Sequence, residues 1–136
     1  MAYQLTFDHL VNYDVGVPGI SIEVRLALRD AAVTLSAKLD TGAENSIFTR
    51  GVGEQLGLTI ENKYPQWFST ATGRFLAFGH EVTLQFAGIE FNALVYFAAD
   101  ASFNRNVLGR FGGLDHLRIG LVDYDGKLYL SKYGDE

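Results

Sequence analysis

Apolar and polar residues alternate over much of this chain, and such alternation is typical of β-strands with one buried face. One alternating run covers residues 20–28, and a second covers residues 33–39. A turn near Asp30 separates the two runs, which together predict one β-hairpin. The second strand of this hairpin would end at Asp40.

Two further hairpins follow the same pattern. One spans residues 82–97 around Ala87-Gly88, and the other spans residues 121–130 around Asp125-Gly126. Asp-Gly favours a two-residue type I′ turn, so we expect a tight turn in the last hairpin.

Signals for helices are few. Thr49 can cap a short helix that ends before Gly57. Residues 110–117 are a second candidate, although Gly112 and Gly113 lower the helix propensity of this segment. Strands therefore dominate the predicted secondary structure.

Length and composition suit a single domain with a substantial core. The chain has 136 residues, of which 48% are hydrophobic and 13% aromatic. No internal repeat, low-complexity tract or linker interrupts it. We therefore expect residues 1–136 to form one all-β domain, a small closed or sandwiched barrel with one or two short helices.

Composition also excludes several kinds of site and partner. The absence of cysteine rules out disulfides, thiolate nucleophiles and cysteine-based zinc sites. The net charge is −5 without a basic cluster, so we expect no nucleic-acid partner. The N-terminus lacks the pattern of a signal peptide, and no apolar stretch is long enough to span a bilayer. We therefore expect a cytoplasmic protein with no membrane partner.

The candidate chemistry lies where the first hairpin ends, at Asp40-Thr41-Gly42-Ala43. A strand end holds a carboxylate on a rigid element, Gly42 lets the backbone turn sharply, and the Thr41 hydroxyl can brace the loop. This layout is that of an aspartic peptidase site, which needs two carboxylates facing each other. Asp-Thr-Gly occurs once in the chain, so a second copy would have to supply the other carboxylate. The tripeptide is also an ordinary turn sequence after a strand, and on its own it leaves that alternative open.

A second segment strengthens the first interpretation. Val107-Leu108-Gly109-Arg110 begins 67 residues after Asp40 (107 − 40). Taken together, this segment and residues 39–43 resemble the retropepsin-like clan of aspartic proteases, which includes retroviral proteases and bacterial relatives. The resemblance covers residues 20–122 and implies a β-barrel-like half, two of which dimerise to form one active site. The chain departs from viral members at both ends, where those proteins have short interleaving strands.

The resemblance implies a role for each residue of the first motif. Asp40 would be the catalytic carboxylate, and Thr41 would hydrogen-bond across the dimer beside it. Gly42 would present its carbonyl to the substrate backbone, and Ala43 would keep the floor of the cleft narrow.

The resemblance also pairs the two motifs. Glu44 stands where the family has an acidic residue, and it would form an ion pair behind the catalytic loop with Arg110, which follows the apolar-Gly block of Val107, Leu108 and Gly109. Without the resemblance, Glu44 and Arg110 are equally well explained as two separate solvated charges.

Members of this family cover the cleft with a mobile hairpin, the flap, and residues 67–76 lie in the corresponding part of the chain. We expect a turn at Thr72-Gly73 because small residues let the tip approach a substrate backbone. An ordinary surface hairpin is the alternative, and Trp67 and Phe68 fit the core as well as a subsite. The candidate flap residues are Ser69, Thr70, Ala71, Thr72, Gly73 and Arg74.

Other chemistries find little support. His9, His80 and His116 do not have the spacing of metal ligands, so we expect neither a metal nor a cofactor. Residues 123–126 lack the closing glutamate of a calcium loop, and no serine lies in a Gly-x-Ser-x-Gly motif.

The sequence therefore predicts an aspartic endopeptidase that is active as a homodimer, with a polypeptide substrate that has hydrophobic residues around the scissile bond. The alternative is a catalytically inactive module with the retropepsin fold that dimerises or binds peptide.

Overall fold

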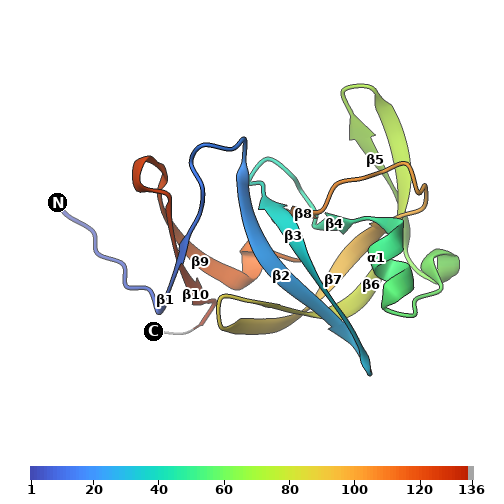
Figure 1. The fold of residues 1–136 in the computed structure, drawn as a ribbon, viewed down its shortest axis with the longest axis horizontal. Coiled ribbons are helices and arrows are strands. Elements are labelled where there is room, and N and C mark those ends of the chain that lie inside the picture. The colour runs from blue at the N-terminus through green and yellow to red at the C-terminus, as the bar shows by residue number, and fades with distance from the viewer. Residues whose placement is uncertain (135–136) are drawn as a thin grey trace.

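The computed structural model describes residues 1–134 of the chain. This part contains ten strands, one short α-helix and three 3-10 helices (Figure 1). The predicted all-β class is confirmed. The strands are β1 (His9–Asn12), β2 (Ile20–Leu28), β3 (Ala31–Leu39), β4 (Ile47–Phe48), β5 (Pro65–Thr70), β6 (Gly73–Phe86), β7 (Ile89–Ala98), β8 (Val107–Leu108), β9 (Leu117–Val122) and β10 (Lys127–Lys132). The helices are α1 (Arg50–Gln55), η1 (Ile60–Asn62), η2 (Leu114–His116) and η3 (Asp123–Asp125).

Seven strands form a sheet that closes on itself. Their order is β2-β3-β8-β4-β7-β6-β5, and an additional pairing of β2 with β6 closes the barrel. This closure leaves β5 outside the ring, and the β5–β6 hairpin projects from the barrel at the upper right of Figure 1. A second sheet, in the order β1-β10-β9, lies beside the barrel at the left.

The first two predicted hairpins are confirmed. In the β2–β3 hairpin, Ile20 pairs with Leu39, so the last residue of β3 lies directly before Asp40. In the β6–β7 hairpin, Phe86 pairs with Ile89 around the expected two-residue turn.

The third hairpin forms, but its expected two-residue turn is wrong. Val122 pairs with Lys127, so the connection has four residues and includes the 3-10 helix η3. The Gly126 amide donates to the Asp123 carbonyl, and the Gly126 carbonyl accepts from the Tyr13 amide at 2.9 Å. The turn is therefore shaped by a contact with the segment after β1, which lies far away in sequence.

One of the two predicted helices is confirmed. The Thr49 hydroxyl caps α1 by accepting from the Val52 amide at 3.4 Å. The helix expected over residues 110–117 is wrong, because only η2 forms there. Gly112 has a left-handed φ of 79°, which interrupts a right-handed helix.

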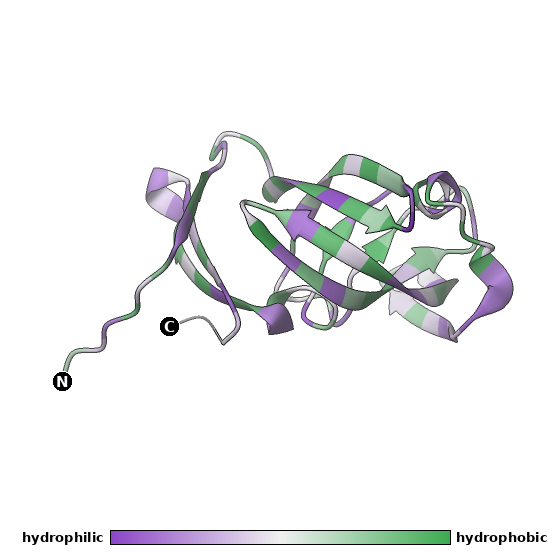
Figure 2. Ribbon diagram, turned by 90° about the horizontal axis from the view of Figure 1, so that it is seen from below, coloured by the Kyte–Doolittle hydropathy of each residue, from purple (hydrophilic) through white to green (hydrophobic). Residues whose placement is uncertain are grey.

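One continuous apolar core joins both sheets. Leu128 and Leu130 of β10 are fully buried in the same cluster as Phe48 and Phe97 of the barrel. Figure 2 shows the alternation along the barrel strands as green and purple bands. Within residues 1–134, no helix has the length and apolar character needed to cross a bilayer.

Candidate active site

Asp40 is held by the barrel. It follows β3, which pairs in parallel with β8 so that Leu39 lies opposite Leu108. The Asp40 amide donates to the Leu108 carbonyl at 2.9 Å, and the Lys38 amide donates to the Asn106 carbonyl at 2.9 Å. Two ladder bonds therefore fix the backbone on both sides of Leu39, while the Asp40 side chain stays exposed.

Asp40 begins a short loop, residues 40–44, which we call the Asp40 loop. This loop turns so that a backbone amide faces the Asp40 carboxylate. The Gly42 amide donates to Asp40 Oδ1 at 2.8 Å, and the Ala43 amide donates to the Asp40 carbonyl at 3.2 Å. A Cβ atom at Gly42 would lie only 3.2 Å from Oδ1. The loop therefore orients the carboxylate through the backbone amide of Gly42.

The structure brings the Asp40 loop against the second predicted segment, residues 107–110. The Arg110 amide donates to the Ala43 carbonyl at 2.9 Å, and the Phe111 amide donates to the Glu44 carbonyl at 2.7 Å. Gly109 lies at the closest approach, where a Cβ atom would be 2.4 Å from the Asn45 carbonyl oxygen. The two motifs thus form one backbone assembly, and glycine at position 109 is what lets them meet.

Ser46 belongs to this assembly, although sequence reasoning did not find it. Its side chain is 0% exposed, and its Oγ accepts from the Gly109 amide at 3.1 Å. Its carbonyl accepts from the Tyr96 amide at 3.0 Å, which ties the loop to β7. A lone serine carries no pattern that would mark it in the sequence.

We expect Ser46→Ala to lower the free energy of unfolding by about 2 kcal/mol, because the buried Gly109 amide loses its acceptor. Chemical denaturation of the variant measures this loss. Ser36→Ala, on the exposed face of β3, is the matched control and should change the free energy of unfolding little. Equal stabilities of the two variants would contradict the role given to the Ser46 hydroxyl.

The expected ion pair between Glu44 and Arg110 does not form in the single chain. In residues 1–134, ion pairs join Arg50 to Glu54 and Glu61, and His116 Nε2 lies 3.7 Å from Asp115 Oδ1. The Arg110 guanidinium instead lies 5.9 Å from the centre of the Phe111 ring. Both side chains are exposed, and water screens a surface ion pair so well that it gains little. The backbone bonds between these two segments join Ala43 to Arg110 and Glu44 to Phe111.

A cavity of about 480 Å³ opens between the Asp40 loop and the β5–β6 hairpin. Asp40, Gly42 and Ala43 line one side, and residues 66–70 of β5 line the other. The cavity therefore holds the exposed carboxylate at one wall and the projecting hairpin at the opposite wall.

The β5–β6 hairpin has the expected place but a slightly different turn. Thr70 pairs with Gly73, so the tip is Ala71-Thr72 and the turn expected at Thr72-Gly73 is shifted by one residue. The Thr70 hydroxyl accepts from the Thr72 amide at 3.3 Å and donates to the Gly73 carbonyl at 3.1 Å. These bonds stabilise a turn at Ala71-Thr72, one residue before the Thr72-Gly73 turn that the preference of glycine for turns predicts.

Aromatic side chains form the base of this hairpin. Phe68 stacks on Phe75 with ring centres 5.5 Å apart, and Phe75 contacts Phe103 at 4.7 Å. Trp67 is 55% exposed, with the Arg74 guanidinium 4.8 Å from its ring centre. Phe68 therefore belongs to an aromatic cluster that lines the cavity, whereas Trp67 is not a core residue.

These features can be compared with known proteins. A family model described as aspartyl protease matches residues 24–120. The chain belongs to the aspartyl protease family. No curated protein matches it.

Two solved structures resemble this member of the family. The EIAV protease complexed with the inhibitor HBY-793 is 23% identical, with 74% of this chain and 88% of that chain covered and a TM-score of 0.58. A retropepsin-like aspartic protease from Rickettsia conorii is 19% identical, with 90% and 96% covered and a TM-score of 0.64. Both confirm the retropepsin-like fold that the two motifs predict.

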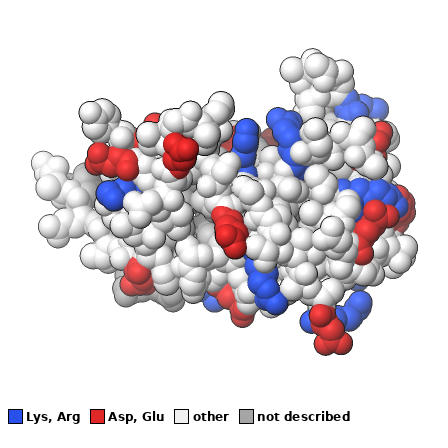
Figure 3. Space-filling view, in the orientation of Figure 1, with Lys and Arg blue, Asp and Glu red and all other residues white. Residues whose placement is uncertain are grey.

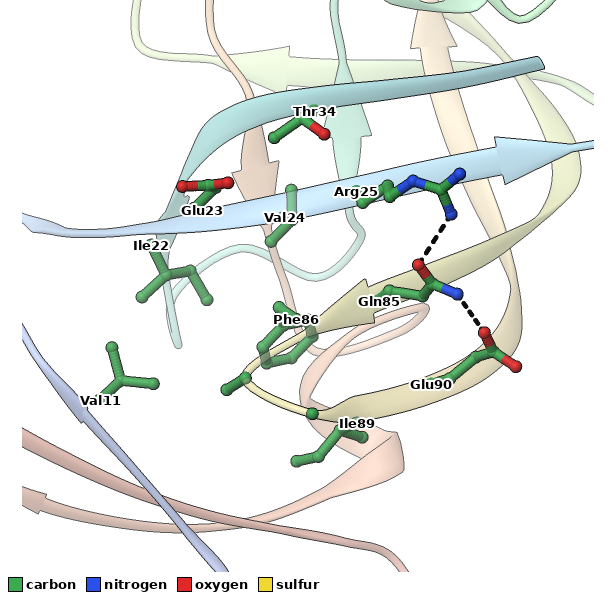
Figure 4. A pocket seen from close by; sticks show the side chains of 12 residues that line it. Val11, Ile22, Glu23, Val24, Arg25, Thr34, Gln85, Phe86, Ile89 and Glu90 are labelled. Carbon is green, nitrogen blue, oxygen red and sulfur yellow. Dashed lines mark hydrogen bonds between the residues drawn. The ribbon is translucent and has the colours of Figure 1, made fainter.

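A larger groove of about 620 Å³ lies elsewhere on the molecule, between β1 and the barrel (Figure 4). Ile22, Phe86 and Ile89 line its apolar part. The Arg25 guanidinium donates to Gln85 at 2.8 Å, and Gln85 in turn donates to Glu90. No residue of the Asp40 loop lines this groove.

The three histidines of the chain do not line the cavity beside Asp40. His80 is buried, with Nε2 2.8 Å from the Ile60 carbonyl oxygen, and His116 stacks on Phe91 at 4.3 Å. Within residues 1–134, no group of three or more His, Cys, Asp or Glu side chains could hold a metal ion.

Proposed function

We propose that this chain is an aspartic endopeptidase that acts as a homodimer, with Asp40 of each chain in one shared site. One observation carries the proposal: the chain has one Asp-Thr-Gly motif, and its Asp40 carboxylate is exposed at the wall of a cavity, where it accepts from the Gly42 amide. An isologous dimer would place the same residue of both chains about its two-fold axis.

The chemistry would be general acid–base catalysis. Two carboxylates that face each other in one site cannot both ionise, so they share one proton. The ionised carboxylate takes a proton from a water molecule, which attacks the scissile carbonyl. The protonated carboxylate donates a hydrogen bond to that carbonyl and stabilises the developing negative charge.

The substrate would be an extended peptide bound as an additional strand. β5 is the last strand of its sheet, so its outer edge has backbone groups that no strand within residues 1–134 pairs. The aromatic cluster of Phe68, Phe75 and Phe103 offers an apolar surface to side chains near the scissile bond. We propose that the β5–β6 hairpin serves as the flap, with Ser69 to Arg74 over the substrate.

The test is cleavage of a peptide library, read by mass spectrometry over a series of pH values. A singly protonated pair of carboxylates is needed, so turnover should follow a bell-shaped profile centred on the acid side of neutral. A statine-type peptide, whose hydroxyl stands in for the attacking water, should block it. Absence of cleavage at every pH by a well-formed dimer would favour the inactive binding module instead.

A further inference from the structure

Arg105 is the positively charged residue among those that line the cavity beside Asp40. It lies on the loop between β7 and β8, two residues before Val107, which lines the same cavity. The other charged lining residues, Asp40 and Glu44, are acidic. In Figure 3, basic side chains stand along the upper surface beside the projecting β5–β6 hairpin.

The Arg105 guanidinium lies over the Phe103 ring and forms no ion pair within residues 1–134. Its central carbon is 6.0 Å from the centre of the Phe103 ring, and Phe103 contacts Phe75 at 4.7 Å. Arg50, by contrast, is engaged by Glu54 and Glu61. The charge of Arg105 is therefore available to an incoming anion.

We propose that Arg105 selects substrates with an aspartate or glutamate side chain close to a large apolar residue. The inference rests on the proposed endopeptidase function and names its substrate class. The planar guanidinium can donate two parallel hydrogen bonds to a carboxylate, which an amide side chain cannot accept in the same way. The neighbouring apolar side chain packs on the cluster of Phe68, Phe75 and Phe103.

The position of the acidic residue follows from the charges of the cavity. Asp40 and Glu44 repel a substrate carboxylate, whereas Arg105 attracts it. An acidic residue is therefore favoured only at the peptide position that faces the Arg105 wall. In a homodimer this wall occurs twice, once on each side of the scissile bond.

The experiment uses pairs of peptides that differ only by glutamate or glutamine, scanned through each position around the cleaved bond. The wild type should prefer glutamate about tenfold in kcat/KM at one position on either side of the bond. The preference should shrink as ionic strength rises, because salt screens an exposed charge. Arg105→Gln should abolish the preference, and Arg105→Glu should reverse it, so that the glutamine peptide is cleaved faster than the glutamate peptide.

Arg25→Gln is the matched control. Arg25 is an exposed arginine of β2 that pairs with Thr34, six residues before Asp40 (40 − 34), or about 20 Å along the strand. It lines the separate groove of Figure 4. This variant should keep the full glutamate preference.

Binding of statine-containing peptides, made as the same glutamate and glutamine pairs, separates this inference from the proposed function. Preferential binding of the glutamate peptide that is lost in Arg105→Gln supports the inference even if no peptide is cleaved. Cleavage without any glutamate preference, or a preference that survives in Arg105→Gln, overturns the inference and leaves the proposed function standing. Absence of binding and cleavage overturns both.

Discussion

Asp40→Asn is expected to lower peptide cleavage by at least about 10³-fold while leaving the fold and the dimer intact. Asparagine has nearly the same shape as aspartate, and its side-chain oxygen can still accept the bond that the Gly42 amide donates at 2.8 Å. It cannot exchange a proton with water, so the acid–base cycle stops. Mass spectrometry of a hydrophobic peptide library measures the loss.

The control for this variant is a check that it stays folded and dimeric. Thermal unfolding and sedimentation of Asp40→Asn should match those of the wild type, because Asp40 is exposed and makes no ion pair in the described residues. Equal cleavage by both proteins would point to a contaminant or to another mechanism. A variant that unfolds or fails to dimerise would show that Asp40 has a structural role that we do not assign to it.

Gly109→Ala should lower the free energy of unfolding by about 3 kcal/mol and abolish cleavage with it. The added Cβ would lie 2.4 Å from the Asn45 carbonyl oxygen and 2.8 Å from the Ala43 carbonyl oxygen. Both are backbone atoms of the segment that carries the Asp40 loop, and the Ala43 carbonyl is also bonded to the Arg110 amide. The two segments must therefore separate, which moves the carboxylate. Urea denaturation and peptide turnover measure the two effects.

Gly51→Ala is the control for the replacement of a glycine by alanine at a position with free space. Gly51 lies in α1, and nothing is found within 4 Å of the position of its added Cβ. Alanine favours helix over glycine, so this variant should be at least as stable as the wild type, by up to about 1 kcal/mol. If Gly109→Ala behaves like Gly51→Ala, the close approach at Gly109 is not needed.

Local patterns in the sequence were enough to predict the hairpin that carries Asp40. The alternation in β2 and β3 predicts both strands and places Asp40 at the end of the hairpin, because burial on one face fixes a period of two. The Thr49 cap of α1 is also local, since donor and acceptor lie three residues apart.

Features that depend on contacts distant in sequence could not be predicted in this way. The turn after β9 is shaped by Tyr13, and the Ser46 hydroxyl accepts from the amide of Gly109, which lies 63 residues away in sequence. The pairing of Glu44 with Arg110 was expected from the family, yet hydration of two exposed side chains outweighs it in the single chain. The tip at Ala71-Thr72 depends on the Thr70 hydroxyl, which competes with the turn preference of glycine.

The central claim is that one site is built from two chains, and subunit mixing tests it most directly. Wild-type and Asp40→Asn chains are mixed in equal amounts, allowed to exchange partners, and assayed at constant total concentration. If each site needs Asp40 from both chains, only wild-type homodimers are active and the mixture retains about one quarter of the wild-type activity. Retention of about one half would mean that each chain works alone, and would contradict the account.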